Sequence, residues 1–189
     1  MSIALWNTLI RLAFFVIITY LLAALRTAML RLAELSSVDE LTGATNSRHF
    51  YAILENELRR LARYGHPLTL AYFDLDGFKT VNDSVGHLEG DAVLQAVVST
   101  ARANLRGSDV IARLGGDEFA MLFPETDQPS AEVVISKTRA RLLEAMESGG
   151  WPVTFSIGAV VCHDAPEQSE RLVKIADDLM YAQSGAMHA

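Results

Sequence analysis

The sequence has a single cysteine, Cys162, so the chain cannot form an internal disulfide bond. This cysteine ends the apolar run VTFSIGAVVC at residues 153–162, which is typical of a buried strand. Disulfides stabilise many proteins of oxidising compartments, whereas a domain with one buried thiol fits a reducing compartment. The scarcity of cysteine therefore places the larger part of the chain in the cytoplasm.

Positive charge is also scarce over most of the chain. Residues 39–189 carry 13 basic and 22 acidic side chains, whereas residues 1–38 carry three arginines and one glutamate. Nucleic-acid polymers bind mainly to basic surfaces, so such a polymer is excluded as the expected partner. A single nucleotide remains compatible with this composition, because metal ions and a few local donors can balance its charge.

Near the N-terminus, charge of either sign is missing over a long stretch. Residues 12–25 read LAFFVIITYLLAAL, and the apolar segment extends back to Ile3 with three polar interruptions. A helix of about 20 apolar residues is long enough to span a bilayer. We therefore expect a transmembrane anchor at residues 1–25, with a secretory signal and a buried helix as the alternatives.

The residues after this segment favour the anchor. Arg26 and Arg31 follow it, and no small-residue cleavage site precedes them, which disfavours a secretory signal. Arginines on one flank of a span usually lie on the cytoplasmic side. The rest of the chain is therefore expected to face the cytoplasm.

Residues 26–38 are expected to form a helical linker. Leu22, Leu25, Met29 and Leu32 are separated by alternating steps of three and four residues. This spacing is that of a coiled-coil seam, which would pair two copies of the chain. An amphipathic linker that lies on its own domain is the alternative explanation of so short a pattern.

Residues 39–189 alternate between helical and strand patterns. The predicted order is helix, strand, helix, strand, strand, helix, strand, helix. The two adjacent strands meet at Gly115 and Gly116, which we expect to form a two-residue hairpin turn because glycine tolerates positive φ. This order predicts an α/β or α+β domain with a mixed sheet surrounded by helices.

Carboxylates occur at two points of the expected sheet. Asp74 and Asp76 alternate with Leu75 at the end of a strand, so they share one face, and Asp117 follows the hairpin turn. Alone, the first pattern fits a capped strand end and the second a simple hairpin. Together, buried carboxylates at one sheet edge would repel one another without a cation. If their strands are neighbours, these residues form a hard-oxygen set suited to Mg²⁺ or Mn²⁺.

Several longer motifs together resemble one protein family. The sequence GGDEF at residues 115–119 is the signature of the GGDEF family of diguanylate cyclases. The segments DELTGATNSRHF and FDLDGFKTVNDSVGHLEGDAVL are similar to its opening and central motifs, and FSIGAV and ADDLMY also match. The resemblance covers residues 38–182. It implies a nucleotide-cyclase-like sheet related to polymerase palms, in agreement with the predicted order of elements.

The resemblance implies condensation of two GTP molecules to cyclic di-GMP, with release of two pyrophosphates. Each subunit of a homodimer would hold one GTP, and the 3′-hydroxyl of one would attack the α-phosphorus of the other. Two Mg²⁺ or Mn²⁺ ions per active site would be held by Asp74, the main-chain carbonyl of Leu75 and Asp117. The expected catalytic residues are Asp117 or Glu118 as the proton acceptor, together with Lys79.

Guanine recognition is implied for Asn82 and Asp91, which match the family's guanine-reading positions. An amide and a carboxylate complement the donors and the acceptor of the guanine Watson–Crick edge. His87 falls on a substrate-contact position. Taken alone, Asn82 and Asp91 fit helix starts, and His87 fits a structural histidine.

Phosphate binding is implied for Lys79 and the main-chain amides around Gly77 and Phe78. A lone lysine is usually solvated, but Lys79 follows a strand-end aspartate closely enough to reach the same phosphates. Gly115 and Gly116 leave room for the triphosphate to approach the backbone. These five residues complete the expected substrate site.

A second ligand site is implied by Arg106 and Asp109. They form an R-x-x-D pattern separated from Gly115 by five residues, which matches the family's product-inhibition site. Arg106 would bind a phosphate or stack on a purine, Asp109 would accept from guanine, and Arg113 would assist. A surface ion pair is the alternative.

The C-terminus departs from the family pattern. Members usually continue past the last tyrosine with lysine and then Gly-Lys or Gly-Arg, whereas this chain reads YAQSGAMHA and offers only Gln183, Ser184 and His188. The leading hypothesis is a diguanylate cyclase of the bacterial inner membrane, with a cytoplasmic catalytic domain at residues 39–189 and feedback inhibition. A degenerate receptor for GTP or cyclic di-GMP and a mononucleotide cyclase are the alternatives.

Overall fold

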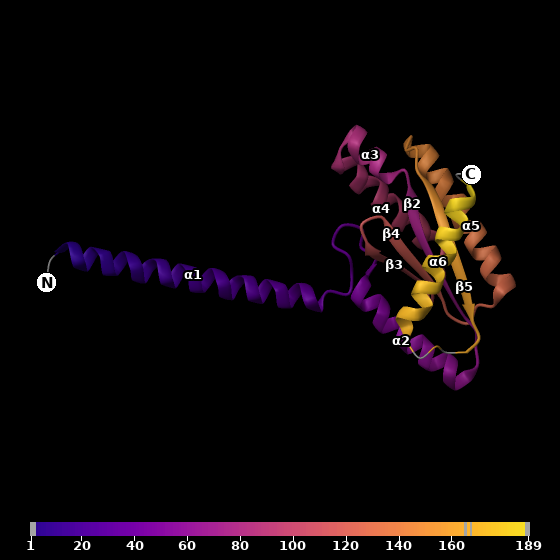
Figure 1. Ribbon diagram of the computed structural model, residues 1–189, viewed down its shortest axis with the longest axis horizontal. Coiled ribbons are helices and arrows are strands. Elements are labelled where there is room, and N and C mark those ends of the chain that lie inside the picture. Colours follow the sequence, from indigo (N-terminus) through magenta and orange to yellow (C-terminus); the bar gives the residue numbers. More distant parts are fainter. Residues whose placement is uncertain (1–2, 165, 167, 188–189) are drawn as a thin grey trace. The chain divides into compact units, whose positions relative to one another are not determined.

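The computed structural model describes residues 3–164, 166 and 168–187 of the chain. It contains two compact units, Met1–Ser36 and Ser37–Ala189 (Figure 1). The first unit is one helix, and the second is an α+β domain.

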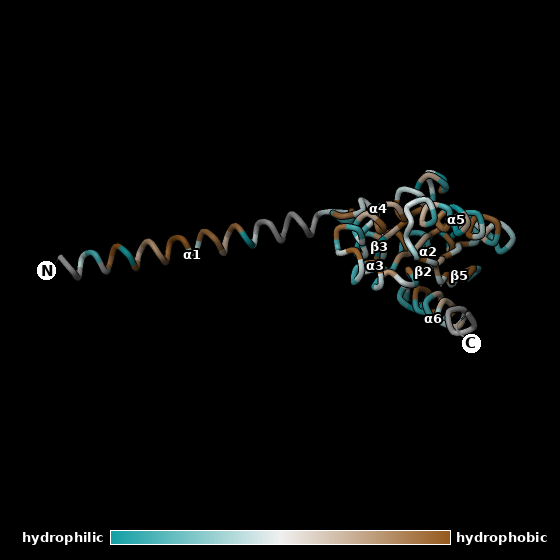
Figure 2. The backbone as a smooth tube through the Cα atoms, turned by 90° about the horizontal axis from the view of Figure 1, so that it is seen from above, coloured by the Kyte–Doolittle hydropathy of each residue, from teal (hydrophilic) through white to brown (hydrophobic). Residues whose placement is uncertain are grey.

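The first unit consists of helix α1 (Ile3–Leu35). Its stretch Leu9–Thr27 is long and apolar enough to cross a membrane, and none of it is buried in the protein. Figure 2 shows this stretch as a largely brown, hydrophobic tube. Helix α1 is therefore a candidate membrane span. Met29 and Leu32 of the expected coiled-coil seam lie outside the residues whose side chains the structure describes.

The second unit is built on a five-stranded sheet in the order β1-β3-β4-β2-β5. The pair β1–β3 is parallel and the other neighbouring strands are antiparallel, so the expected mixed sheet is confirmed. The strands are β1 (Thr45–Asn46), β2 (Leu68–Asp76), β3 (Val110–Gly115), β4 (Glu118–Phe123) and β5 (Thr154–Cys162).

Within the part of the domain that the structure describes, five helices surround the sheet (Figure 1). They are α2 (Ser47–Tyr64), α3 (Phe78–Val85), α4 (His87–Asn104), α5 (Gln128–Gly149) and α6 (Ser169–Met187). Their ends follow local chemistry: Asn46 caps α2 by accepting from the His49 amide, and Gly65 ends it in the left-handed conformation. Asp127 caps α5 in the same way.

Strand β2 separates two hydrophobic cores because its side chains alternate between the faces of the sheet. Ala71, Phe73 and Leu75 pack on the side of α4 and α5. Leu68, Leu70 and Tyr72 pack on the side of α2 and α6. Asp74 and Asp76 continue the second series, so the carboxylates at the end of β2 lie on the α6 side.

Helix α6 lies directly against β5 at Gly158. A Cβ atom at this position would lie 2.1 Å from the carbonyl oxygen of Ala176 and 2.3 Å from the main-chain nitrogen of Met180. Both contacts are to backbone, so any side chain at Gly158 would force α6 away from the sheet. The glycine of the FSIGAV motif therefore sets how closely α6 covers this face.

Candidate active site

The signature turn joins β3 and β4. Gly115 is the last residue of β3 and pairs with Glu118, so the two turn residues are Gly116 and Asp117. The prediction of a Gly115–Gly116 turn was therefore wrong by one residue. A register shift between Arg113 and Gly115 moves the turn along the chain. Gly116 adopts a φ of 48°, which glycine tolerates at little cost.

The turn brings the expected carboxylates together. Asp74 lies opposite Glu118 in the β2–β4 register. Burial raises the pKa of Asp74 to about 6, and the negative charge of Asp117 is the next largest cause, followed by smaller contributions from Asp76 and Glu118. The Leu75 amide donates to Asp74 at 2.8 Å and opposes this shift in part. Asp74 and Asp117 are thus close enough to repel each other.

This repulsion is what a divalent cation would relieve. The two carboxylates, with the Leu75 carbonyl that the family resemblance adds, would supply the oxygen ligands that Mg²⁺ prefers, and substrate phosphates usually complete such a site. Among the residues that the structure describes, no group of three or more histidine, cysteine or carboxylate side chains is arranged to hold a metal ion. The residues fit a metal that binds together with a triphosphate.

Asp76 has partners of its own, although it shares a strand and a face with Asp74. The Ser156 hydroxyl donates to its carboxylate at 2.9 and 3.0 Å, and the Thr154 hydroxyl donates at 3.2 Å. Both hydroxyls come from β5. Asp76 therefore ties β2 to the edge strand.

Tyr72 is a site residue that sequence reasoning missed. It lies two residues before Asp74 on the same face, and burial together with the charge of Glu118 raises the pKa of its hydroxyl. The period of two from Asp74 back to Tyr72 could have identified it.

The expected phosphate-binding residues begin immediately after β2. Gly77 has a φ of 82°, and Phe78 and Lys79 open the first turn of α3. The free amides of a helix start favour an anion. A Cβ atom at Gly77 would lie 2.9 Å from the carbonyl oxygen of Pro152, so a larger residue would not fit. Lys79 is exposed next to this turn.

The two guanine-reading candidates lie next to each other. Asn82 is on α3 and Asp91 is on α4, and a Cβ atom at Gly90 would lie 2.0 Å from the Asn82 side-chain oxygen. The amide of Asn82 therefore packs against the backbone that precedes Asp91. His87 is exposed at the start of α4.

The R-x-x-D residues lie at the other end of β3. Arg106 and Asp109 border a cavity of about 140 Å³ together with Arg102, which sequence reasoning missed. The Arg106 amide donates to the Asp109 carboxylate at 2.9 Å and fixes this loop. The length of β3 separates this cavity from the signature turn by roughly 20 Å.

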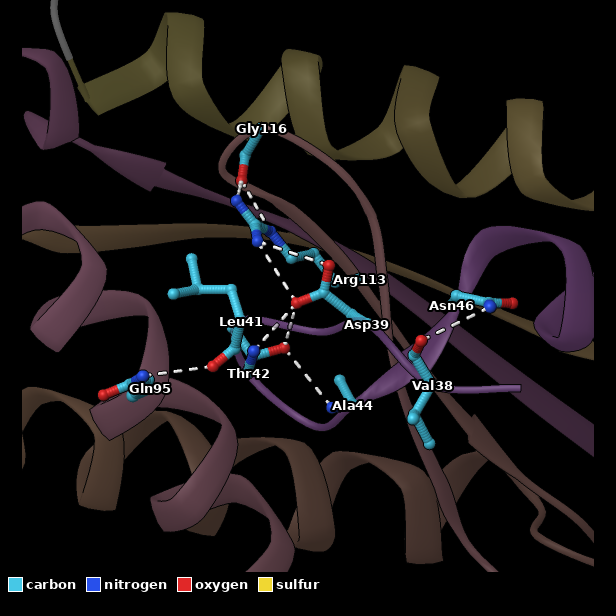
Figure 3. A network of polar contacts seen from close by, with 9 residues as sticks. All are labelled: Val38, Asp39, Leu41, Thr42, Ala44, Asn46, Gln95, Arg113 and Gly116. Atoms are coloured by element: carbon cyan, nitrogen blue, oxygen red, sulfur yellow. Dashed lines mark hydrogen bonds and ion pairs between the residues drawn. The ribbon is translucent and has the colours of Figure 1, made fainter. Parts of the chain in front are cut away.

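Arg113 was expected to assist at that cavity, but its guanidinium contacts the signature turn (Figure 3). Nε and Nη2 donate to the Gly116 carbonyl at 2.9 and 2.8 Å, and Nη1 lies 3.2 Å from Asp39. Burial alone would raise the pKa of Asp39, but hydrogen bonds from Thr42 and the contact with Arg113 outweigh it and lower the pKa. The start of the domain is thereby tied to the turn.

Three residues of the altered C-terminus cannot be assigned positions in the site. Helix α6 continues through Gln183 and Ser184, but their side chains lie outside the described residues. His188 lies outside them altogether.

Residues 36–188 match the family model described as "Diguanylate cyclase, GGDEF domain". The chain belongs to the GGDEF family. It is 34% identical over 148 residues to the diguanylate cyclase DosC of Escherichia coli (strain K12), covering 76% of this chain and 32% of DosC. The chain thus spans about a third of the length of that curated relative.

Solved structures of GGDEF proteins share the fold. The diguanylate cyclase SiaD from Pseudomonas aeruginosa, in complex with its activator SiaC, is 30% identical, with a TM-score of 0.72 over 97% of this chain and 72% of that one. A microbial GGDEF domain described in its interaction with cyclic di-GMP is 31% identical, with a TM-score of 0.69 over 79% of this chain and 90% of that one. The palm-like α+β fold expected from the sequence is confirmed.

Proposed function

We propose that this GGDEF protein is a diguanylate cyclase that condenses two GTP molecules into cyclic di-GMP and releases two pyrophosphates. The observation that carries the proposal is the meeting of Asp74 and Asp117 at the signature turn, where burial and then the negative charge of Asp117 raise the pKa of Asp74. A bound cation would stabilise the charged form of these carboxylates. The family membership and the names of the relatives support the same reaction.

In the proposed reaction, Asp74, the Leu75 carbonyl and Asp117 would hold two Mg²⁺ or Mn²⁺ ions. When bound, the ions neutralise triphosphate charge and lower the pKa of the attacking 3′-hydroxyl. Lys79 and the amides at the start of α3 bind the β- and γ-phosphates. These contacts orient the α-phosphorus for in-line attack.

The guanine base is read by Asn82 and Asp91, with His87 as a further contact. Glu118 and Asp117 remain the candidate proton acceptors. Glu118 lies opposite Asp74 in the β2–β4 register. One such site binds one GTP, so two copies of the domain must face each other to form a product with two phosphodiester bonds. A homodimer is therefore part of the proposal.

The cellular setting is proposed from the N-terminal helix. A membrane span at Leu9–Thr27 would anchor the chain, and Arg26 at its end favours a cytoplasmic domain by the positive-inside rule. The relatives come from bacteria, so the membrane in this proposal is the bacterial inner membrane. Helical residues after the span would bring two catalytic domains together.

The first test is turnover by the full chain. Purified dimer with Mg²⁺ and GTP is expected to form cyclic di-GMP, and Asp117→Asn is expected to lower kcat by at least about 10³-fold because it removes a charged ligand at the reaction centre. Asp164→Asn, an exposed aspartate after β5, is the matched control and should keep parental turnover. An intact dimer that forms no cyclic di-GMP would rule out the enzyme.

Product inhibition is proposed at the Arg106–Asp109 cavity. Arg106→Ala is expected to raise the inhibitory concentration of cyclic di-GMP at least about tenfold, because a charge-assisted contact to phosphate is lost. Turnover at low product concentration should remain near the parental value, since the cavity lies at the far end of β3. Unchanged sensitivity to added cyclic di-GMP would contradict this assignment.

A receptor without turnover is the second candidate function. The observation that favours it is the C-terminus, which lacks the basic residues usual after the last tyrosine. Turnover in the parent chain separates the candidates, because a cyclase forms cyclic di-GMP and loses that activity in Asp117→Asn. A receptor that uses Arg106 and Asp109 binds the product with or without Asp117 and shows no turnover in the parent chain.

A further inference from the structure

The segment between α5 and β5 contacts both halves of the proposed nucleotide site. Helix α5 ends at Gly149 and is capped by Gly150, which has a φ of 70°, and the Trp151 amide donates to the Met146 carbonyl at 2.9 Å. The next residue, Pro152, places its carbonyl oxygen against Gly77 of the phosphate-binding turn. The segment is thus held firmly where it meets the site.

Trp151 reaches the guanine side of the site through Glu89. Its indole Nε1 donates to the Glu89 carboxylate at 2.7 Å, and both side chains are half-buried. A hydrogen bond to a carboxylate is stronger than one between neutral groups. A Cβ atom at Gly149 would lie 2.4 Å from the indole ring, so the ring is confined on its other side as well.

Glu89 lies midway between His87 and Asp91 on the first turns of α4. Residues four apart share a helix face, and the residue between them points away from that face. Trp151 can therefore hold Glu89 while His87 and Asp91 lie on the opposite face of α4. The hydrogen bond from Trp151 to Glu89 therefore fixes the rotation of this turn of α4 about the helix axis.

The corner formed by α3 and α4 needs such support. Helix α3 has eight residues, of which Val81 is the buried one, and Gly77 and Gly86 at its ends both have positive φ. A helix this short is not stable by itself, and glycines allow its ends to rotate. The contacts of Trp151 and Pro152 restrain both ends of this corner.

We propose that Trp151 and Glu89 are positioning residues that set the selectivity of the nucleotide site for guanine. The inference rests on the proposed function, because it assumes that GTP binds between α3 and α4. Trp151 does not touch the base itself. It keeps Asp91 aligned with Asn82, so that a carboxylate and an amide meet the Watson–Crick edge together.

The test measures binding rather than turnover, so that it does not depend on catalysis. The full chain is titrated with a non-hydrolysable GTP analogue and with the inosine counterpart, which lacks the 2-amino group that Asp91 would read. The ratio of the two Kd values is the selectivity. We expect Trp151→Phe to reduce this ratio about tenfold. The substitution removes the charge-assisted hydrogen bond to Glu89, which holds the turn of α4 that carries Asp91.

Variants of Glu89 provide the second arm. Glu89→Ala is expected to reduce the selectivity ratio as much as Trp151→Phe does. The double variant should lose no more selectivity than either single variant, because both substitutions remove the same contact. Glu89→Gln keeps an acceptor for the indole and should retain most of the selectivity. Glu57→Ala, which removes a half-buried carboxylate bound to Arg60 on α2, is the matched control and should leave the ratio unchanged.

The indole supplies a spectroscopic readout. Trp6→Phe leaves Trp151 as the one tryptophan of the chain, and we expect its emission to change when the guanine analogue binds. Glu89→Ala should remove that change.

Three outcomes would overturn the inference. They are an unchanged selectivity ratio in both single variants, equal weakening of the two analogues, and additive losses in the double variant. A parent chain that binds neither analogue would contradict the proposed function itself. If the parent chain binds the analogues and the variants keep its selectivity, only the role of Trp151 and Glu89 is contradicted.

Discussion

Two aspartates of the same domain have opposite surroundings. Asp39 receives hydrogen bonds from the Thr42 amide and hydroxyl at 2.9 and 2.6 Å and lies beside the Arg113 guanidinium. Asp74 is half-buried among Asp117, Asp76 and Glu118, and its pKa is raised to about 6. Both positions are partly buried, so burial alone does not decide which carboxylate is stable as an anion.

The difference separates a structural acid from a functional one. The Asp39 network joins the first turn of the domain to the signature turn. The Arg113 guanidinium balances the negative charge of Asp39 within the protein. The carboxylates around Asp74 leave negative charge unbalanced by the protein side chains described there. Charge that the fold does not balance is available to a ligand, and this is why the signature turn rather than the Asp39 turn is the active-site candidate.

The sharpest way to test this comparison is Asp74→Asn. We expect turnover to fall at least about 10³-fold, because a ligand of the proposed ions is lost. Without divalent metal, the same variant should be more stable than the parent, by on the order of 1 kcal/mol, since it removes one of several repelling charges. Product assays and urea unfolding in a chelating buffer measure the two effects.

Asp76→Asn is the matched control for that stability measurement. Asp76 accepts from Ser156 and Thr154, so its replacement should weaken the domain rather than stabilise it. If Asp74→Asn and Asp76→Asn both stabilise the domain, the hydrogen bonds to Asp76 do not distinguish it from Asp74.

Much of this site could be predicted from the sequence because its chemistry lies at strand ends and turns. The alternation of Asp74 and Asp76 on β2 and the glycines before Asp117 predict where the carboxylates occur. Their meeting needs the antiparallel pairing of β2 with β4, which a spacing pattern does not define. The family resemblance supplied that information.

The parts that sequence patterns missed are short or depend on distant contacts. Strand β1 has two residues and α3 has eight, so neither has a period long enough to recognise. The position of the signature turn was missed by one residue because of the bulge before Gly115. Arg113 was assigned to the inhibitory cavity by its place in the sequence, yet its partners are 74 residues away at Asp39 and three away at Gly116.

Arg113→Ala tests the other half of the comparison. It removes the ion pair to Asp39 and both hydrogen bonds to Gly116, and it leaves a half-buried carboxylate with fewer partners. We expect a loss of about 2 kcal/mol in unfolding free energy, measured by urea denaturation.

Arg60→Ala is the matched control, because Arg60 pairs with Glu57 and Glu125 while its own side chain is 54% exposed. Exposed pairs of this kind contribute less than about 1 kcal/mol. Equal losses in the two variants would show that Arg113 is an ordinary surface arginine.

The smallest expected effect is the pH dependence of stability that comes from Asp39. Its folded-state pKa is lowered below the ordinary value of 3.8, because hydrogen bonds from Thr42 and the Arg113 contact outweigh its burial. A lowered pKa means that the unfolded chain binds the proton more readily than the folded chain does. The stabilisation is therefore complete at pH values above 3.8 and is lost as the pH falls through the folded-state pKa. Asp39→Asn should therefore be less stable than the parent at neutral pH, and the gap should close in acid. A gap that stays constant between neutral pH and pH values below 3.8 would mean that Asp39 contributes through its shape and hydrogen bonds rather than its charge.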